Sequence, residues 1–181
     1  AVLRVAPNQL VELLLPMLDP KAELVSKAIA KGLPAGPGGA KGRVVFTSEE
    51  AVEWAHKGEQ VILVREETSP EDVDGMHKSQ AVLTTKGGMT SHAALVARGW
   101  GKCCIVGCGD IEIHQESKSF RTKDGTLIKE GDWLSLNGTK GLVYEGSLDL
   151  VAINLEKNPY YKSLMKLVDQ LKTMGVRINA E

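Results

Sequence analysis

The residue of this chain best suited to chemistry is His92, which follows the glycine pair Gly87 and Gly88 and opens an alanine-rich apolar run. Two glycines allow a tight turn, Thr90 or Ser91 can cap a following helix, and the free N–H groups of a first helical turn attract an anion. Imidazole has a reference pKa of about 6.5 and is a competent nucleophile near neutral pH. This pattern predicts a histidine that carries a phosphoryl group, with a structural helix histidine as the alternative.

Two further residues are candidates to support His92. Arg98 lies six positions farther on, about 240° around an ideal helix, so it would either neutralise charge across the site or anchor the helix to a neighbour. Thr68 follows a predicted strand and would reach the same sheet edge as the histidine, where it could donate a hydroxyl. For Thr68 we favour the simpler interpretation of a helix cap.

Short apolar runs alternate with helical patterns between residues 43 and 106. A continuous apolar run is typical of a buried strand, and the alternating order predicts a parallel sheet with His92 at a strand-to-helix turn. The Gly/Pro-rich stretch 32–42 is predicted to be a loop, and Asp124-Gly125 and Asn137-Gly138 predict hairpins. The predicted strands are residues 43–46, 61–64, 81–84 and 103–106, and the predicted helices are residues 49–56, 70–78 and the one that His92 opens.

The composition argues against several classes of partner. The 181 residues carry 22 basic and 23 acidic side chains, for a net charge of −1, which gives no electrostatic basis for binding nucleic acid or an acidic membrane surface. No stretch approaches the roughly 18 to 20 consecutive apolar residues of a membrane span. Cys103, Cys104 and Cys108 argue against a disulfide framework and for a reducing compartment, so we expect a cytoplasmic protein.

Other motifs that could bind a ligand are interpreted as structural. The three cysteines lack the paired spacing of a metal site, which predicts buried thiols and no metal in this chain. The glycine-rich residues 36–42 match neither the dinucleotide fingerprint nor the phosphate loop, so a nucleotide is expected to bind elsewhere. Glu71, Asp72 and Asp74 are expected to complement a helix dipole.

The segment around the histidine resembles a known signature. Residues 87–94 read Gly-Gly-Met-Thr-Ser-His-Ala-Ala and are followed by Ala97-Arg98, which is similar to the phosphohistidine signature of the phosphoenolpyruvate-utilising enzymes. Within that family, Gly-Trp-Gly-Lys-Cys-Cys at residues 99–104 resembles the pyruvate phosphate dikinases rather than the phosphoenolpyruvate synthases or enzyme I of the sugar phosphotransferase system. Further matches extend the resemblance over most of residues 30 to 150.

The resemblance implies an α/β fold, the swivelling β/β/α phosphohistidine domain, with His92 phosphorylated on Nε2. The whole enzyme would interconvert ATP, orthophosphate and pyruvate with AMP, pyrophosphate and phosphoenolpyruvate, using Mg²⁺ bound by other domains. Thr90 matches a threonine that is regulated by phosphorylation in plant members, which implies a regulatory kinase and phosphatase. The residues expected to support the phosphoryl site are Gly87, Gly88, Thr90, Ser91, Arg98 and Thr68.

The same resemblance predicts how the chain is organised. Residues 1–30 would be a linker from an ATP-grasp-type nucleotide domain, residues 31–154 the phosphohistidine domain, and residues 155–181 a helical linker to a barrel that binds phosphoenolpyruvate and pyruvate. In the last segment Asn158 and Pro159 predict the start of a helix of about 16 residues, whose apolar stripe stops at Gly175.

Because it would lack the nucleotide and pyruvate sites, this chain alone is expected to turn nothing over. A parent enzyme in a plastid or glycosome would carry its targeting signal outside these residues. Two alternatives stay open, namely the equivalent domain of a phosphoenolpyruvate synthase and a non-catalytic binding or scaffold module of the same fold.

Overall fold

The computed structural model describes residues 4–152 and 159–173. Contacts divide the chain into two compact units, one formed by residues 15–151 and the other by residues 1–14 together with residues 152–181. The larger unit contains every residue of the candidate site.

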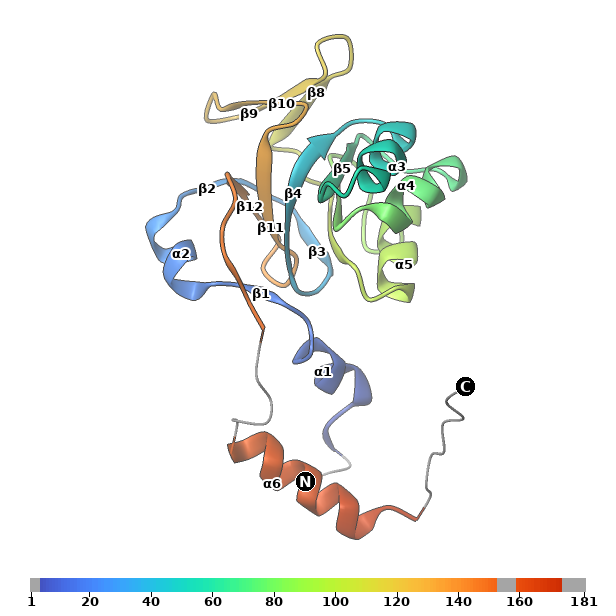
Figure 1. Cartoon of the computed structure of the whole chain (residues 1–181), viewed down its shortest axis with the longest axis vertical. Helices are drawn as coiled ribbons and strands as arrows, with labels where there is room; N and C mark the ends of the chain where they lie inside the picture. The colour runs from blue at the N-terminus through green and yellow to red at the C-terminus, as the bar shows by residue number, and fades with distance from the viewer. Residues whose placement is uncertain (1–3, 153–158, 174–181) are drawn as a thin grey trace. The chain divides into compact units, whose positions relative to one another are not determined.

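An eight-stranded mixed sheet forms the centre of the larger unit (Figure 1). In spatial order its strands are β2 (Ala28–Lys31), β12 (Leu142–Glu145), β11 (Trp133–Asn137), β4 (Gly39–Val45), β5 (Val61–Arg65), β6 (Ala81–Thr84), β7 (Cys103–Val106) and β3 (Leu33–Gly36). Strands β4 to β7 are mutually parallel, and the other neighbours pair antiparallel. Strands β6 and β7 are buried along their whole length, which is why the sequence shows continuous apolar runs there.

The predicted loop over residues 32–42 is wrong, because this stretch contains β3 and the first part of β4. Strand β3 lies at the edge of the sheet, where Pro34 is tolerated. Two glycines here allow neighbouring backbones to approach closely. A Cβ on Gly36 would lie 2.1 Å from the carbonyl oxygen of Lys102, and a Cβ on Gly39 would lie 2.6 Å from the amide nitrogen of Leu18. The glycines therefore mark tight packing of strands.

Each face of the large sheet has its own apolar core. One core joins it to a small antiparallel sheet, and in it Ile62 packs with Phe120 and Ile128 from the small sheet. The strands of the small sheet, in spatial order, are β10 (Leu127–Lys129), β9 (Ser119–Thr122) and β8 (Ile111–His114). The opposite face carries Val61 and Leu63 in a second core, since side chains alternate along a strand.

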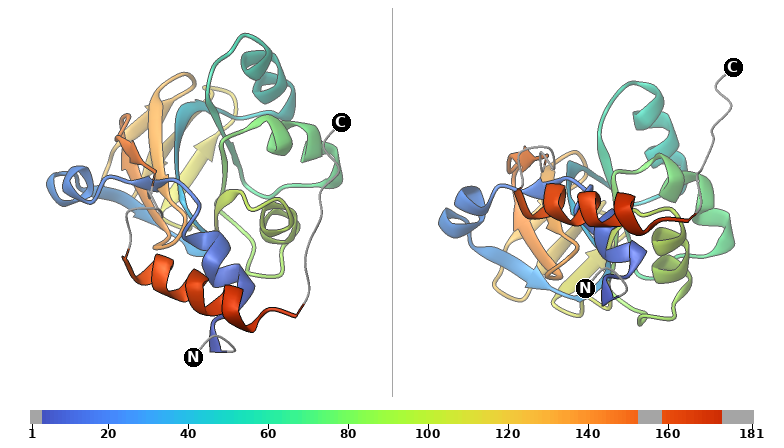
Figure 2. Two further views of the ribbon diagram at one scale, coloured as in Figure 1. Left: turned by 60° about the horizontal axis from the view of Figure 1, so that its bottom comes forward. Right: turned by 90° about the horizontal axis from the view of Figure 1, so that it is seen from below.

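Three helices cover that second face, and Figures 1 and 2 show them gathered on one side of the sheet. They are α3 (Ser48–His56), α4 (Val73–Lys78) and α5 (His92–Gly99). Ala51, Met76 and Ala94 bury their side chains against the sheet. The layers are therefore sheet, sheet and helices, and the predicted α/β class with a β/β/α arrangement is confirmed.

The predicted helix over residues 70–78 begins as a 3₁₀ turn, η2 (Pro70–Asp72), and continues as α4. Helices α3 and α4 pack closely, because a Cβ on Gly75 would lie 2.5 Å from the hydroxyl of Ser48. That hydroxyl accepts a hydrogen bond of 3.0 Å from the Gly75 amide.

Residues 15–30 pack within the larger unit. Strand β1 (Met17–Leu18) pairs antiparallel with β13 (Leu150–Val151), and α2 (Pro20–Val25) carries Glu23. The Glu23 carboxylate accepts hydrogen bonds from Asn137 Nδ2 at 2.6 Å and from the Tyr144 hydroxyl at 3.1 Å. The contact boundary thus lies at residues 14 and 15, whereas the sequence placed the domain boundary at 30 and 31; the role of either flank as a linker to another domain stays a prediction.

The smaller unit contains α1 (Pro7–Glu12) and α6 (Pro159–Leu171). Helix α6 agrees with the predicted C-terminal helix over 13 residues. The predicted cap at Asn158 and the stop at Gly175 lie outside the described residues. None of the described helices is long and apolar enough to cross a membrane.

Candidate phosphohistidine site

His92 is the first residue of α5 and follows the turn that leaves β6. Ser91 is the N-cap, and its side chain accepts a hydrogen bond of 3.4 Å from the Ala94 amide. Of the two predicted caps, Ser91 therefore takes the role, whereas Thr90 lies exposed one residue earlier. The histidine itself is half-buried, so its ring is held by the fold while part of it remains reachable.

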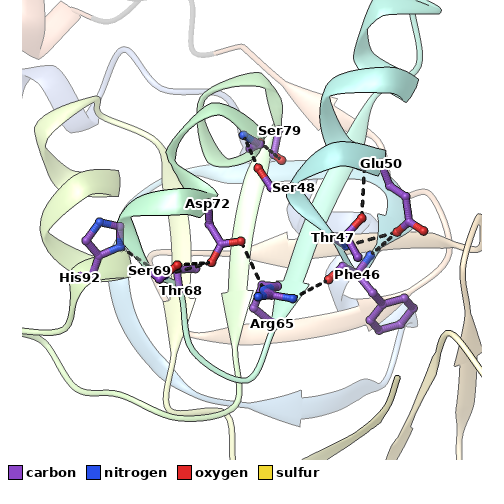
Figure 3. A network of polar contacts seen from close by, with 11 residues as sticks. Phe46, Thr47, Ser48, Glu50, Arg65, Thr68, Ser69, Asp72, Ser79 and His92 are labelled. Carbon is purple, nitrogen blue, oxygen red and sulfur yellow. Dashed lines mark hydrogen bonds and ion pairs between the residues drawn. The ribbon is translucent and has the colours of Figure 1, made fainter. Parts of the chain in front are cut away.

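The Thr68 hydroxyl lies 3.0 Å from Nδ1 of His92 (Figure 3). Thr68 follows β5, whose carboxyl end meets that of the parallel neighbour β6 at the same sheet edge. The favoured interpretation of Thr68 as a helix cap is wrong, because Ser69 is the N-cap of η2. The alternative interpretation, in which the Thr68 hydroxyl contacts the histidine, is the one that the structure contains.

This contact occupies Nδ1 of His92, and the tautomer of the ring sets the direction of the hydrogen bond. An Nδ1–H that donates to the Thr68 oxygen leaves the lone pair of a neutral imidazole on Nε2. Thr68 is only 5% exposed, so its hydroxyl is a fixed partner from the protein interior. The site can therefore present Nε2 to an electrophile.

The two glycines before His92 play different parts. Gly87 has φ +93°, in the left-handed region, and a Cβ there would lie 2.9 Å from Cβ of Ser91. Gly88 has no such dihedral, and a Cβ there would meet nothing within 4 Å. The tight turn thus requires glycine at position 87, while position 88 faces open space beside the helix N-terminus.

Arg98 folds back along its own helix toward that turn. Its Nε donates to the Ala94 carbonyl at 3.1 Å, and a terminal guanidinium nitrogen donates to the Met89 carbonyl. Of the two predicted roles, these contacts correspond to an anchor, and what is anchored is the turn that precedes His92. A role in neutralising phosphoryl charge stays a prediction.

An exposed ion pair fastens the same turn to the Thr68 loop. Lys86 Nζ lies 2.7 Å from a carboxylate oxygen of Glu66, and the Lys86 amide donates to the Glu66 carbonyl at 2.9 Å. Pairing raises the pKa of Lys86 and lowers the pKa of Glu66. The two loops that carry Thr68 and His92 are therefore joined by both backbone and side chain.

The three cysteines are buried free thiols in the apolar cores, as predicted. Burial raises the pKa of each thiol to about 12, which leaves them protonated and poor ligands or nucleophiles near neutral pH. Among residues 4–152 and 159–173, no group of three or more His, Cys, Asp or Glu side chains could hold a metal ion.

Similarity to known proteins agrees with the site geometry. Residues 57–141 match the family model described as PEP-utilising enzyme, mobile domain. Over all 181 residues the chain is 45% identical to pyruvate, phosphate dikinase of Clostridium symbiosum and 47% identical to pyruvate, phosphate dikinase 1, chloroplastic, of Arabidopsis thaliana. This match places residues 57–141 in the mobile-domain family of the PEP-utilising enzymes. The predicted resemblance to this family, and within it to the dikinases, is confirmed.

The chain covers 20% and 18% of the lengths of those two relatives. Among solved structures, the NMR solution structure of Enzyme I (nEIt) matches with 24% sequence identity and a TM-score of 0.34, over 61% of this chain and 38% of that one. A TM-score this low supports no conclusion, and the fold assignment rests on the topology of the chain itself.

One part of this site was missed from the sequence. The sequence predicts that Asp72 complements a helix dipole. In the structure Asp72 is buried, accepts a hydrogen bond from the Ser69 amide and forms an ion pair with Arg65. The spacing Ser69-x-x-Asp72 is a capping-box pattern that could have indicated the first contact. No pattern in the sequence indicated the second.

Proposed function

We propose that this chain is the phosphoryl-carrier domain of a pyruvate, phosphate dikinase, with the phosphoryl group carried on Nε2 of His92. The observation that supports this most is the contact between the Thr68 hydroxyl and Nδ1 at 3.0 Å. It directs the free lone pair outward from a histidine that also opens a helix. Identity of 45% to 48% with dikinases over the whole chain favours this parent over a phosphoenolpyruvate synthase.

In the transfer step, the Nε2 lone pair attacks phosphorus while the bond from phosphorus to the leaving group breaks and its electrons depart with that group. The ring gains positive character, which strengthens the Nδ1–H hydrogen bond to Thr68. The new anion then lies near the N-terminus of α5. Since Ser91 already satisfies the Ala94 amide, the amides of His92 and Ala93 are the first-turn donors that remain to face it.

In the parent enzyme, His92 would attack the β-phosphorus of ATP and release AMP. The terminal phosphoryl of the resulting pyrophosphoryl-histidine would pass to orthophosphate, and the remaining one would pass to pyruvate. The Mg²⁺ that neutralises phosphate charge in these steps would be bound by residues of the other domains.

The partners of this reaction are an ATP-grasp-type nucleotide domain and a barrel that binds pyruvate and phosphoenolpyruvate, both in the same parent chain. Tethering keeps the carrier at a high effective concentration at each site. The isolated chain is expected to be inactive in turnover, since it lacks both sites. A regulatory kinase and phosphatase acting on Thr90 belong to the same proposal, as does a reducing compartment that keeps the three thiols free.

Phosphoramidate tests the carrier without the other domains, because it donates a phosphoryl group to histidine and releases ammonia. We expect one acid-labile, base-stable phosphate per chain, seen by intact mass and assigned to Nε2 by ³¹P and ¹⁵N NMR. His92→Asn should fold and take none. Equal labelling of His92→Asn would show that another residue reacts, and an unlabelled wild-type chain would refute the proposed carrier.

A further inference from the structure

We propose that Asp72, held by Arg65, is a positioning residue for His92: it fixes the loop that carries Thr68 and thereby sets which nitrogen of the imidazole is protonated. This inference rests on the proposed function of His92. It concerns two residues that touch neither the histidine nor the incoming phosphoryl group. Figure 3 shows the chain of contacts that connects them to the site.

The first link joins Asp72 to the residue after Thr68. One carboxylate oxygen, Oδ2, accepts from the Ser69 amide at 2.9 Å and from the Ser69 hydroxyl at 3.3 Å. Asp72 is only 4% exposed, so solvent does not compete for these bonds. Because the Ser69 amide belongs to the peptide unit that begins at Thr68, holding it fixes the plane of that peptide.

The second link joins Asp72 to the central sheet. Its other carboxylate oxygen, Oδ1, lies 3.4 Å from Nε of Arg65, the last residue of β5. A terminal guanidinium nitrogen of Arg65 donates to the Phe46 carbonyl at 3.2 Å, just beyond the end of β4. The Arg65 guanidinium thus connects the end of β4 to the Asp72 carboxylate, and that carboxylate holds the loop that follows β5.

The loop is fixed from the side of His92 as well. The Thr85 amide donates to the Arg65 carbonyl at 3.2 Å, and the Lys86 amide donates to the Glu66 carbonyl at 2.9 Å. Backbone hydrogen bonds therefore hold the segment after β6 against residues 65 and 66, while the Asp72 carboxylate holds Ser69. Thr68 lies between these attachments, and its hydroxyl is left little freedom in distance or direction from Nδ1.

The Asp72 carboxylate is buried and the Arg65 side chain is partly buried, and burying a charge lowers stability unless it is paired and hydrogen-bonded. As a cap, a neutral Asn would serve nearly as well as Asp. An asparagine at position 72 could accept the hydrogen bond from the Ser69 amide, but it could not form an ion pair with Arg65 at the same time. A purely structural role therefore predicts a change in stability only, whereas a positioning role predicts a change in the His92 tautomer.

The test compares Asp72→Asn and Arg65→Lys with two matched controls in the 181-residue chain. Glu59→Gln breaks a similar arrangement away from the site, in which Arg43 pairs with Glu59 at 3.1 Å and donates to the Gly131 carbonyl at 3.0 Å. Ser48→Ala removes a buried hydrogen bond between α3 and α4. Ring ¹⁵N shifts of His92 report the tautomer, and phosphoramidate labelling reports the rate.

We expect the wild-type chain and both controls to hold His92 mainly as the Nδ1–H tautomer. In Asp72→Asn and Arg65→Lys the Nε2–H form should grow, and labelling at equal folded fraction should slow by between about fivefold and a hundredfold. Wild-type tautomer and rate in both variants would overturn the proposal. If the wild-type chain takes no phosphate at all, the carrier function fails, while the tautomer measurement still decides the positioning role.

Discussion

The side chain of His92 is oriented by Thr68, a residue 24 positions away in the sequence. The sequence predicted that both would reach one sheet edge, because the ends of neighbouring parallel strands must meet there. It did not predict the hydrogen bond, since the pattern of apolar runs carries no information on side-chain direction in the loops after those strands. The same limit applies to Arg98. Helical periodicity placed Arg98 on a different face of the helix from His92, but it could not show that the guanidinium turns back to the Met89 carbonyl.

Thr90 is exposed and lies two residues before the carrier, which makes a charge at this position a probe of the site. At about 6 Å and an effective dielectric constant near 20, two unit charges repel by about 3 kcal/mol, and solvent and salt reduce this at the surface. We expect Thr90→Glu to fold normally and to be labelled at His92 at least about tenfold more slowly than the wild-type chain. Intact mass over time in low salt measures the rate.

Two variants separate charge from shape at this position. Thr90→Ser keeps the hydroxyl, and Thr90→Gln has the size of the glutamate without its charge, so both should be labelled at nearly the wild-type rate. Equal slowing in Thr90→Gln and Thr90→Glu would mean that the side chain blocks the site by its bulk. An unchanged rate in Thr90→Glu would remove the electrostatic basis for regulation at this residue.

At the scale of elements, the turn from β6 into α5 depends on one glycine of the pair. Gly87→Ala must place a Cβ at φ +93° and within 2.9 Å of Ser91, so we expect a loss of stability of about 1–3 kcal/mol. Gly88→Ala is the matched control, and it should change stability by less than about 0.5 kcal/mol because it faces open space. Urea unfolding measures both, and similar losses in the two variants would contradict this division.

The elements themselves were predictable where burial is complete on both faces. Residues 81–84 and 103–106 were predicted as strands and are β6 and β7 without a shift. Edge strands were missed, because β3 carries Pro34 and Gly36, which in isolation indicate a loop. Proline is tolerated in a strand at the edge of a sheet, and glycine fits where another backbone comes close; both conditions are properties of the tertiary structure.

At the scale of the whole molecule, the sequence predicted the β/β/α layers through a resemblance, and the two apolar cores give the physical reason for them. Strand β7 contributes Cys103 to the core between the sheets and Cys104 to the core beneath the helices. Adjacent residues of one strand thus face opposite layers. The thiols therefore report on the integrity of both cores at once.

The thiols also predict how stability depends on pH. Burial raises the pKa of Cys103, Cys104 and Cys108 to about 12, whereas the same thiols in an unfolded chain ionise near the ordinary value of 9.0. Above pH 9 the unfolded state therefore holds fewer protons than the folded state, so stability must fall as pH rises toward 12. Below pH 9 this contribution is fully present and constant.

We expect the free energy of unfolding to fall by about 2 kcal/mol or more between pH 8 and pH 11, because ionisation of the unfolded thiols favours unfolding. Cys104→Ala, which removes one such thiol from the helix-side core, should show a smaller fall over the same interval. At pH 8 a thiol reagent should label no cysteine of the folded chain and all three in urea. Rapid labelling of the folded chain at pH 8, or identical pH curves for the variant and the wild-type chain, would show that the thiols are not held in closed cores.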